Sequence, residues 1–191
     1  MLKRIRYNSP VVLTFALLSL GALLLSFLTD GVSTGLVFSV YRSSPTDPLT
    51  YVRLFCHVLG HSGWEHYISN MTYILLLGPM LEEKYGSRPL LLMICVTALT
   101  TGLVFIALFP GQALLGASGV VFMMIVLSSL SSFGQGEVPL TLILVVVLFL
   151  GQEIVSGVTT ADNISQLTHV VGGLVGGLMG LYFHRRQGSG G

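Results

Sequence analysis

The stretch that decides the fold lies near the C-terminal end and reads HVVGGLVGGLMG over residues 169–180. It holds no acidic or basic side chain except one histidine, and three of its glycines, Gly172, Gly176 and Gly180, recur every four residues. Residues at that spacing share one stripe of a helix, and a stripe of small residues lets two membrane helices pack with their backbones nearly touching. His169 begins the same stripe, so we expect its imidazole to be pressed against the partner helix.

The composition of the whole chain indicates a membrane protein. Hydrophobic residues make up 52% of the 191 residues and charged residues 9%, whereas soluble domains carry roughly 25% charged residues. The mean hydropathy is +0.83. A formal net charge of +1 provides no basic field for nucleic acid, which is therefore excluded as a partner. Cys56 and Cys95 are too few for a disulfide framework.

The apolar segments predict the number of helices. A membrane-spanning helix needs roughly 20 mostly apolar residues, and segments of that kind are bounded here by glycine, proline or charged residues. The first segment is too long for a signal peptide and lacks a cleavage site, so we interpret it as a retained helix. We predict an all-α membrane protein, a single domain over 1–191, with six transmembrane helices at 10–28, 67–81, 89–109, 114–130, 138–154 and 166–183.

Basic residues predict the orientation of this bundle, because they gather in cytoplasmic loops. With a cytoplasmic N-terminus, only Arg42 and Arg53 fall on the outer side. The cytoplasmic side receives Lys3, Arg4, Arg6, Lys84, Arg88, Arg185 and Arg186. Both termini are then cytoplasmic. No Arg/Ser-rich presequence is present, which favours a bacterial inner membrane over mitochondria for this multi-pass protein.

A serine between glycines is the first candidate for chemistry. Ser118 lies in Gly116-Ala117-Ser118-Gly119, at the start of a predicted helix. The first amide N–H groups of a helix have no intrahelical partner and face any anion placed there, as an acyl-transfer intermediate requires. The competing explanation is a helix N-cap, because serine is a preferred capping residue.

Three further polar residues belong to the apolar segments, where a polar side chain is costly unless it has a partner or a water-filled cavity. His66 and Asn70 are four residues apart, so they share one helix face and offer two hydrogen-bond donors. An interfacial helix start that meets water would explain that pair equally. His169 lies at the same membrane side as Ser118, and a neutral histidine can accept the proton of a serine nucleophile.

A metal site is the rival use of the histidines. His57 and His61 are four residues apart, a spacing that suits two zinc ligands on one helix. However, neither HExxH nor HxxEH occurs around Glu65 and His66, and no third ligand has an obvious spacing. We therefore expect neither a metal nor another cofactor.

Together these residues resemble the rhomboid intramembrane serine proteases, in their bacterial six-helix form. The resemblance covers most of the chain: a histidine pattern up to Asn70, the GxSG motif at Gly116–Gly119, and a last helix with His169, Gly172 and Gly176. It implies a dyad of Ser118 as nucleophile and His169 as general base. It further implies an oxyanion hole made of His66, Asn70 and the Ser118 backbone N–H.

The resemblance also implies supporting roles and reveals three departures. The supporting residues are Gly116, Gly119, Phe122, Gly172 and Gly176. Phe122 falls where the family often has a tyrosine packed on the catalytic ring. Val52 stands where a tryptophan is expected before Arg53, and Thr168 is bulkier than the small residue expected before the histidine.

We therefore expect an intramembrane serine endopeptidase that cleaves single-span membrane proteins within lipid. Two other classes compete with this interpretation. An inactive rhomboid-like protein would bind membrane clients without cutting them, although such relatives usually lack the serine or the histidine. A small transporter predicts repeated halves with broken helices, and no such repeat is visible in the sequence.

Overall fold

The computed structural model describes residues 7–130, 140, 143, 144, 147 and 163–188. Helices dominate the described chain, with one short two-stranded sheet. In chain order the elements are α1 (Pro10–Leu28), α2 (Val32–Leu36), β1 (Val40–Tyr41), α3 (Pro48–Cys56), the 3-10 helix η1 (His57–Leu59), α4 (Trp64–Tyr85), α5 (Ser87–Leu108), β2 (Ala113–Leu114), α6 (Ser118–Leu130) and α8 (Asn163–Gly188).

The observed helix bounds agree in part with those predicted from the sequence. Helix α1 has the bounds predicted from the sequence, while α4 and α8 extend beyond theirs at both ends. The helix predicted from residue 114 begins instead at Ser118, because Ala113 and Leu114 pair with β1 in an antiparallel ladder. The predicted span 138–154 falls mostly outside the described residues, so the count of six helices stays a prediction.

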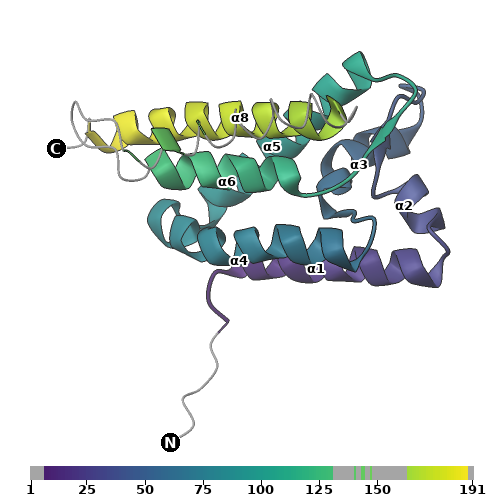
Figure 1. Ribbon diagram of the computed structural model, residues 1–191, viewed down its shortest axis with the longest axis horizontal. Helices are drawn as coiled ribbons and strands as arrows, with labels where there is room; N and C mark the ends of the chain where they lie inside the picture. The colour runs from purple at the N-terminus through teal and green to yellow at the C-terminus, as the bar shows by residue number, and fades with distance from the viewer. Residues whose placement is uncertain (1–6, 131–139, 141–142, 145–146, 148–162, 189–191) are drawn as a thin grey trace, which may run out of the picture.

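The long helices lie side by side along the long axis of the molecule (Figure 1). Helix α1 packs on α4, α6 packs on α8, and contacts of α4 and α5 with α6 join the two pairs. The short elements between α1 and α4 gather at one end of this bundle (Figure 1). Apolar side chains from α1, α4, α5, α6 and α8 form one continuous core.

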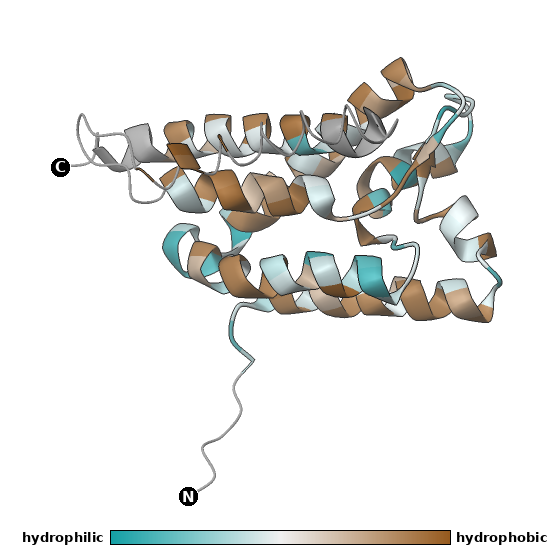
Figure 2. Cartoon of the chain, viewed as in Figure 1, coloured by the Kyte–Doolittle hydropathy of each residue, from teal (hydrophilic) through white to brown (hydrophobic). Residues whose placement is uncertain are grey.

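Large apolar side chains are exposed on the outer surface of the bundle. Hydrophobic residues make up much of the long helices in Figure 2, and Leu28, Leu76 and Leu178 are 82%, 71% and 70% exposed. Such faces suit lipid rather than water. Within the described residues, α1 and α5 are each long and apolar enough to cross a membrane, and α6 and Leu167–Phe183 are shorter apolar helices.

Helix α1 is fastened to the far end of α4 by a buried carboxylate. Glu82 is 5% exposed, and its two oxygens accept hydrogen bonds from the backbone N–H groups of Val11 and Val12, each at 3.0 Å. Ser87 Oγ donates to the same carboxylate at 2.7 Å. The helices can approach because Gly78 lacks a Cβ, which would lie 2.7 Å from Val12 Cγ2.

The glycine stripe of α8 packs on α6, as the sequence predicted. A Cβ on Gly172 would collide with the backbone of Gly119, and a Cβ on Gly176 would lie 2.5 Å from the Met123 carbonyl oxygen. At Gly180 it would lie 2.9 Å from Leu130 Cδ1. The two helix backbones are therefore in near contact at Gly172 and Gly176, which fixes the register of His169 relative to α6.

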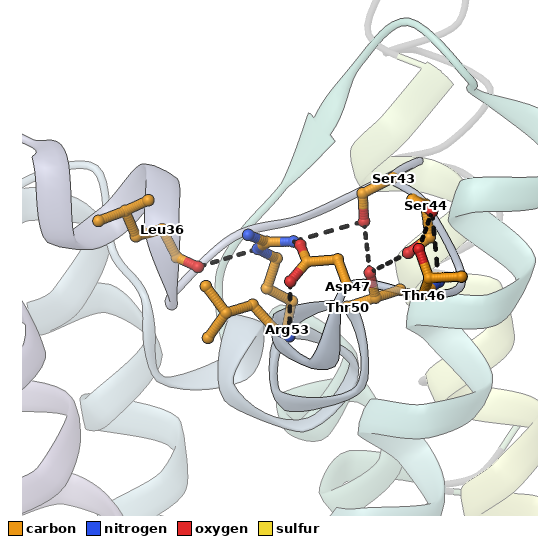
Figure 3. A network of polar contacts seen from close by, with 8 residues as sticks. Leu36, Ser43, Ser44, Thr46, Asp47, Thr50 and Arg53 are labelled. Carbon is orange, nitrogen blue, oxygen red and sulfur yellow. Dashed lines mark hydrogen bonds and ion pairs between the residues drawn. The ribbon is translucent and has the colours of Figure 1, made fainter.

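A buried arginine organises the segment between α1 and α4 (Figure 3). Arg53 is 3% exposed, and its guanidinium donates to the Leu36 carbonyl oxygen at 2.9 Å and to the Asp47 carboxylate at 2.9 Å. Asp47 also caps α3 by accepting from the Leu49 N–H. The aromatic ring over the guanidinium belongs to Tyr41, 4.6 Å away. Tyr41 thus supplies an aromatic partner although position 52 is an exposed valine.

Candidate active site

Ser118 is the first residue of α6, one position beyond the helix cap. The Ala117 carbonyl accepts the first helical hydrogen bond, from the Val121 N–H at 2.9 Å, so Ala117 occupies the N-cap position. The interpretation of Ser118 as an N-cap residue is therefore wrong. The hydroxyl-bearing residue instead contributes one of the backbone N–H groups that the start of a helix leaves without an intrahelical partner.

The turn before Ser118 needs a glycine and is held by the first loop. Gly116 has φ +125°, a conformation that residues with a Cβ rarely adopt. Its N–H donates to the His57 carbonyl oxygen at 2.9 Å. A Cβ at this position would lie 2.8 Å from two ring atoms of His66. Gly116 therefore lets the chain turn into α6 while an imidazole lies directly against its backbone.

His169 lies on the face of α8 that packs on α6. Its ring stacks on that of Phe122, with centroids 4.1 Å apart and planes inclined by 23°. Phe122 is one turn beyond Ser118 on the same helix. This contact brings the histidine to the end of α6 at which Ser118 begins, and it holds the imidazole nearly parallel to the Phe122 ring.

A second contact between α6 and α8 lies directly beside these two residues. Gly119 follows Ser118, and a Cβ on it would lie 3.1 Å from the Cγ2 atoms of both Thr101 and Thr168. Thr168 precedes His169 and is 3% exposed. The larger residue is accommodated because the facing residue is a glycine. The chain neighbours of Ser118 and His169 thus pack closely against each other.

The tautomer of His66 is set by Ser62. The Ser62 backbone N–H donates to His66 Nδ1 at 3.4 Å, and the Ser62 hydroxyl lies 3.1 Å from the same nitrogen. A neutral ring that accepts at Nδ1 carries its proton on Nε2. Nε2 is one of the two ring atoms that face Gly116. His66 thus has a hydrogen-bond donor near the turn that leads into Ser118.

Asn70 is buried, with 6% of its surface exposed. Its side-chain amide nitrogen donates to the His66 carbonyl oxygen at 2.9 Å, within α4. An amide nitrogen carries two protons, so one such bond uses half of its donor capacity. The sequence predicted that His66 and Asn70 share one face of a helix. This hydrogen bond joins the two residues directly.

His57 ties the first loop to α5 and to the turn at Gly116, a role that sequence reasoning missed. Its ring is fully buried; Nδ1 donates to the Arg53 carbonyl oxygen at 3.1 Å, and Nε2 lies 3.3 Å from Thr101 Oγ1. Burial lowers the pKa of His57 to about 4, so the ring is neutral at pH 7. The sequence does not reveal that the backbone carbonyl of His57 accepts a hydrogen bond from the distant Gly116.

The ring of His61 packs against the ring of His66. Its Nδ1 donates to the Leu59 carbonyl oxygen at 3.0 Å, and its ring meets those of His66 and Tyr67 edge-on, with centroids 5.0 and 5.5 Å apart. Burial lowers the pKa of His61 to about 4, helped by the nearby His66. The remaining nitrogen, Nε2, is buried without a hydrogen-bond partner in the described structure.

The spacing that suggested a zinc site does not place its two histidines on one helix. His57 begins η1, whereas His61 follows Gly60 in an extended segment. The Nδ1 atom of each ring donates to a carbonyl oxygen. Among the described residues, no group of three or more His, Cys, Asp or Glu side chains is arranged to hold a metal ion.

Comparison with protein families assigns most of the chain. The family model of the Rhomboid domain matches residues 48–186. This range runs from the start of α3 into the last turn of α8 and includes Ser118, His169, His66 and Asn70. No match was found among curated proteins.

Proposed function

The chain belongs to the rhomboid family and is a membrane protein, and from this membership we propose that it is an intramembrane serine endopeptidase. The observation that carries the proposal is the stack of His169 on Phe122, one turn from Ser118. It supports a nucleophile and a base at the same end of two helices whose register is locked by glycines.

In the proposed reaction, Ser118 Oγ attacks the carbonyl carbon of a substrate peptide bond while His169 accepts the hydroxyl proton. Collapse of the tetrahedral intermediate breaks the C–N bond, and His169 returns the proton to the leaving amine. The acyl-enzyme is then hydrolysed by a water molecule, whose proton passes to His169 and back to Ser118. In this proposal the two residues act together as a catalytic dyad.

The negative charge of each intermediate would fall near the start of α6. We propose that the Ser118 backbone N–H, His66 Nε2 and the Asn70 amide stabilise it as an oxyanion hole. The place of Ser118 in the first turn of α6, where backbone N–H groups have no intrahelical partner, and the tautomer favoured by Ser62 support the first two donors. Each donor in such a site is worth roughly 10²–10³ in rate. Asn70 would redirect its amide, or use its second proton, when the intermediate forms.

We further propose a multi-pass protein of six spans with both termini in the cytoplasm, in a bacterial inner membrane. Its substrates would be single-span membrane proteins. A peptide bond of such a substrate must leave its helix before the serine can attack it. The apolar outer faces of α1, α5 and α8 support a lipid environment. The proposed mechanism requires no metal or cofactor.

The test is cleavage of a single-span substrate reconstituted in liposomes, with a fluorophosphonate probe that labels activated serines. We expect wild type to cut and to be labelled, Ser118→Ala to do neither, and His169→Ala to lose at least about 10³-fold in rate. Ser129→Ala is the matched control, since its hydroxyl donates to the Ile125 carbonyl within the same helix; it should behave as wild type.

The outcome that overturns the proposal is a folded wild type that neither cuts a panel of substrates nor is labelled. The client-binding alternative would then explain the protein better. Folding is checked for every variant by its thermal unfolding midpoint in detergent.

A further inference from the structure

A cavity of about 520 Å³ opens beside the proposed oxyanion site. Its lining residues come from the start of α4 and the turn before it: Ser62, Gly63, Trp64, Glu65, His66 and Ser69. Positions 62, 65, 66 and 69 recur at intervals of three and four residues, so they share one side of the helix and its entry. His66 belongs both to this lining and to the contact with Gly116, which joins the cavity to the turn before Ser118.

The chemistry of the lining is that of a site for a cation. Among the six described residues that line it, Glu65 is the only acidic one, and none is Lys or Arg. The Trp64 indole, 48% exposed, also lines the cavity, and an aromatic ring of this kind can interact with a cation. Ser62 and Ser69 add hydroxyl acceptors. His66 does not compete for the carboxylate through Nδ1, because that nitrogen is engaged by Ser62.

A structural role for Glu65 accounts for less of this arrangement. A carboxylate in the first turn of α4 interacts favourably with the helix dipole, which explains an acidic residue at this position. It does not explain the polar cavity that Glu65 lines. Because His66 belongs both to this lining and to the contact with Gly116, a substrate side chain that enters the cavity would lie near the cleaved bond.

We propose that this cavity is a substrate subsite in which Glu65 selects a Lys or Arg side chain close to the cleaved bond. The inference rests on the proposed function, because it places the substrate backbone at Ser118. It makes the charge of one substrate side chain a determinant of recognition.

The test measures binding and cleavage separately. Transmembrane peptides that differ at one position by Lys, Gln or Glu, scanned along the cleavage region, are titrated into the Ser118→Ala variant in nanodiscs. At one position we expect the Lys peptide to bind about two- to fivefold more tightly than the Gln peptide, as for a partly exposed ion pair, and the Glu peptide more weakly. The preference should shrink at high salt.

Variants of Glu65 measure what its carboxylate contributes to the preference for the Lys peptide. In the Ser118→Ala background, Glu65→Gln should abolish the Lys preference, and Glu65→Lys should reverse it in favour of the Glu peptide. Glu83→Gln, an exposed carboxylate at the other end of α4, should leave it unchanged. Equal binding of the three peptides at every position, or a Lys preference that survives Glu65→Gln, overturns the inference.

The two proposals fail in different ways. If wild type cleaves through Ser118 and His169 but no charge preference is found, the subsite is wrong and the protease stands. If the peptides show a Glu65-dependent preference but wild type cuts none of them, the cavity is a client-binding site and the protease proposal fails.

Discussion

Phe122 and His169 lie face to face across the contact between α6 and α8, with ring centroids 4.1 Å apart. The stack restricts rotation of the imidazole, while the packing of Gly172 against Gly119 restricts sliding of the helix that carries it. A base that keeps both its position and its ring plane is pre-organised for proton transfer, since misplacement of a catalytic group by about 1 Å can cost roughly 100-fold in rate.

We predict that Phe122→Ala lowers kcat by about two- to tenfold with little change in KM. The size follows from the worth of an aromatic stack, about 0.5–1.5 kcal/mol beyond its buried area. Phe122→Tyr, which keeps the ring, should retain near wild-type kcat. Steady-state cleavage of a reconstituted substrate measures both constants. An unchanged kcat in Phe122→Ala would show that the stack does not position His169.

Adjacent glycines of α8 should respond differently to a methyl group. Gly172→Ala would collide with the Gly119 backbone, whereas a Cβ on Gly173 would lie at an ordinary 3.6 Å from Val126 Cγ2. We expect Gly172→Ala to lose about 1–3 kcal/mol of unfolding free energy and most activity. Gly173→Ala should be neutral or stabilised by up to about 1 kcal/mol through helix propensity. Thermal unfolding in detergent checks the pair, and equal effects would argue against close contact at Gly172.

Removing the guanidinium of Arg53 should loosen the segment between α1 and α4. Arg53→Ala removes the donors that Arg53 supplies to the Leu36 carbonyl oxygen and to Asp47 Oδ2, while Asp47 Oδ1 keeps its bond from the Leu49 N–H. The expected loss is about 2–3 kcal/mol of unfolding free energy, below the range for a fully buried pair because Asp47 is partly exposed. Arg42→Ala, exposed on the same segment, is the control and should be neutral. A loss shared equally by both variants would contradict the assigned network.

Acid should destabilise the protein through two buried histidines. Burial lowers the pKa of His57 and of His61 to about 4, against about 6.5 in the unfolded chain. Below pH 6.5 the unfolded state binds protons that the folded state does not, so stability falls as pH drops from about 6.5 to about 4 and then levels off. Each histidine contributes up to about 3 kcal/mol to this loss.

The measurement is the unfolding midpoint of the protein in detergent between pH 7.5 and pH 4. His61→Phe keeps the ring and removes one titrating group, so its midpoint should fall less steeply over that range. A flat profile for wild type would mean that these histidines are not neutral and buried as described.

Features that depend on a local sequence pattern could be predicted from the sequence. The four-residue repeat of Gly172, Gly176 and Gly180 predicted a close helix contact, and the structure confirms it. The bounds of α1 followed from an apolar run that begins with Pro10, because proline suits the first turn of a helix. Six helices, cytoplasmic termini and the roles of the dyad remain predictions.

Features that depend on distant partners did not follow from the sequence. The start of α6 was placed four residues too early, because an apolar run does not reveal that Leu114 pairs with Val40. Val52 stands where a tryptophan was expected beside Arg53, and the sequence did not reveal that the ring of Tyr41 contacts Arg53 from another element. The bond from Gly116 to the His57 carbonyl joins residues far apart in the chain, a pairing that only the folded backbone brings about.

The carboxylate of Glu82 determines how far the N-terminal part of this protein can be truncated. The family match begins at residue 48, so α1 lies outside it, yet both oxygens of Glu82 are committed to the N–H groups at the start of α1. A fragment trimmed to the matched range would lose both backbone donors of this carboxylate. The range that the family model matches thus leaves out a helix that the matched part contacts, and a fragment intended to fold on its own should begin before Pro10.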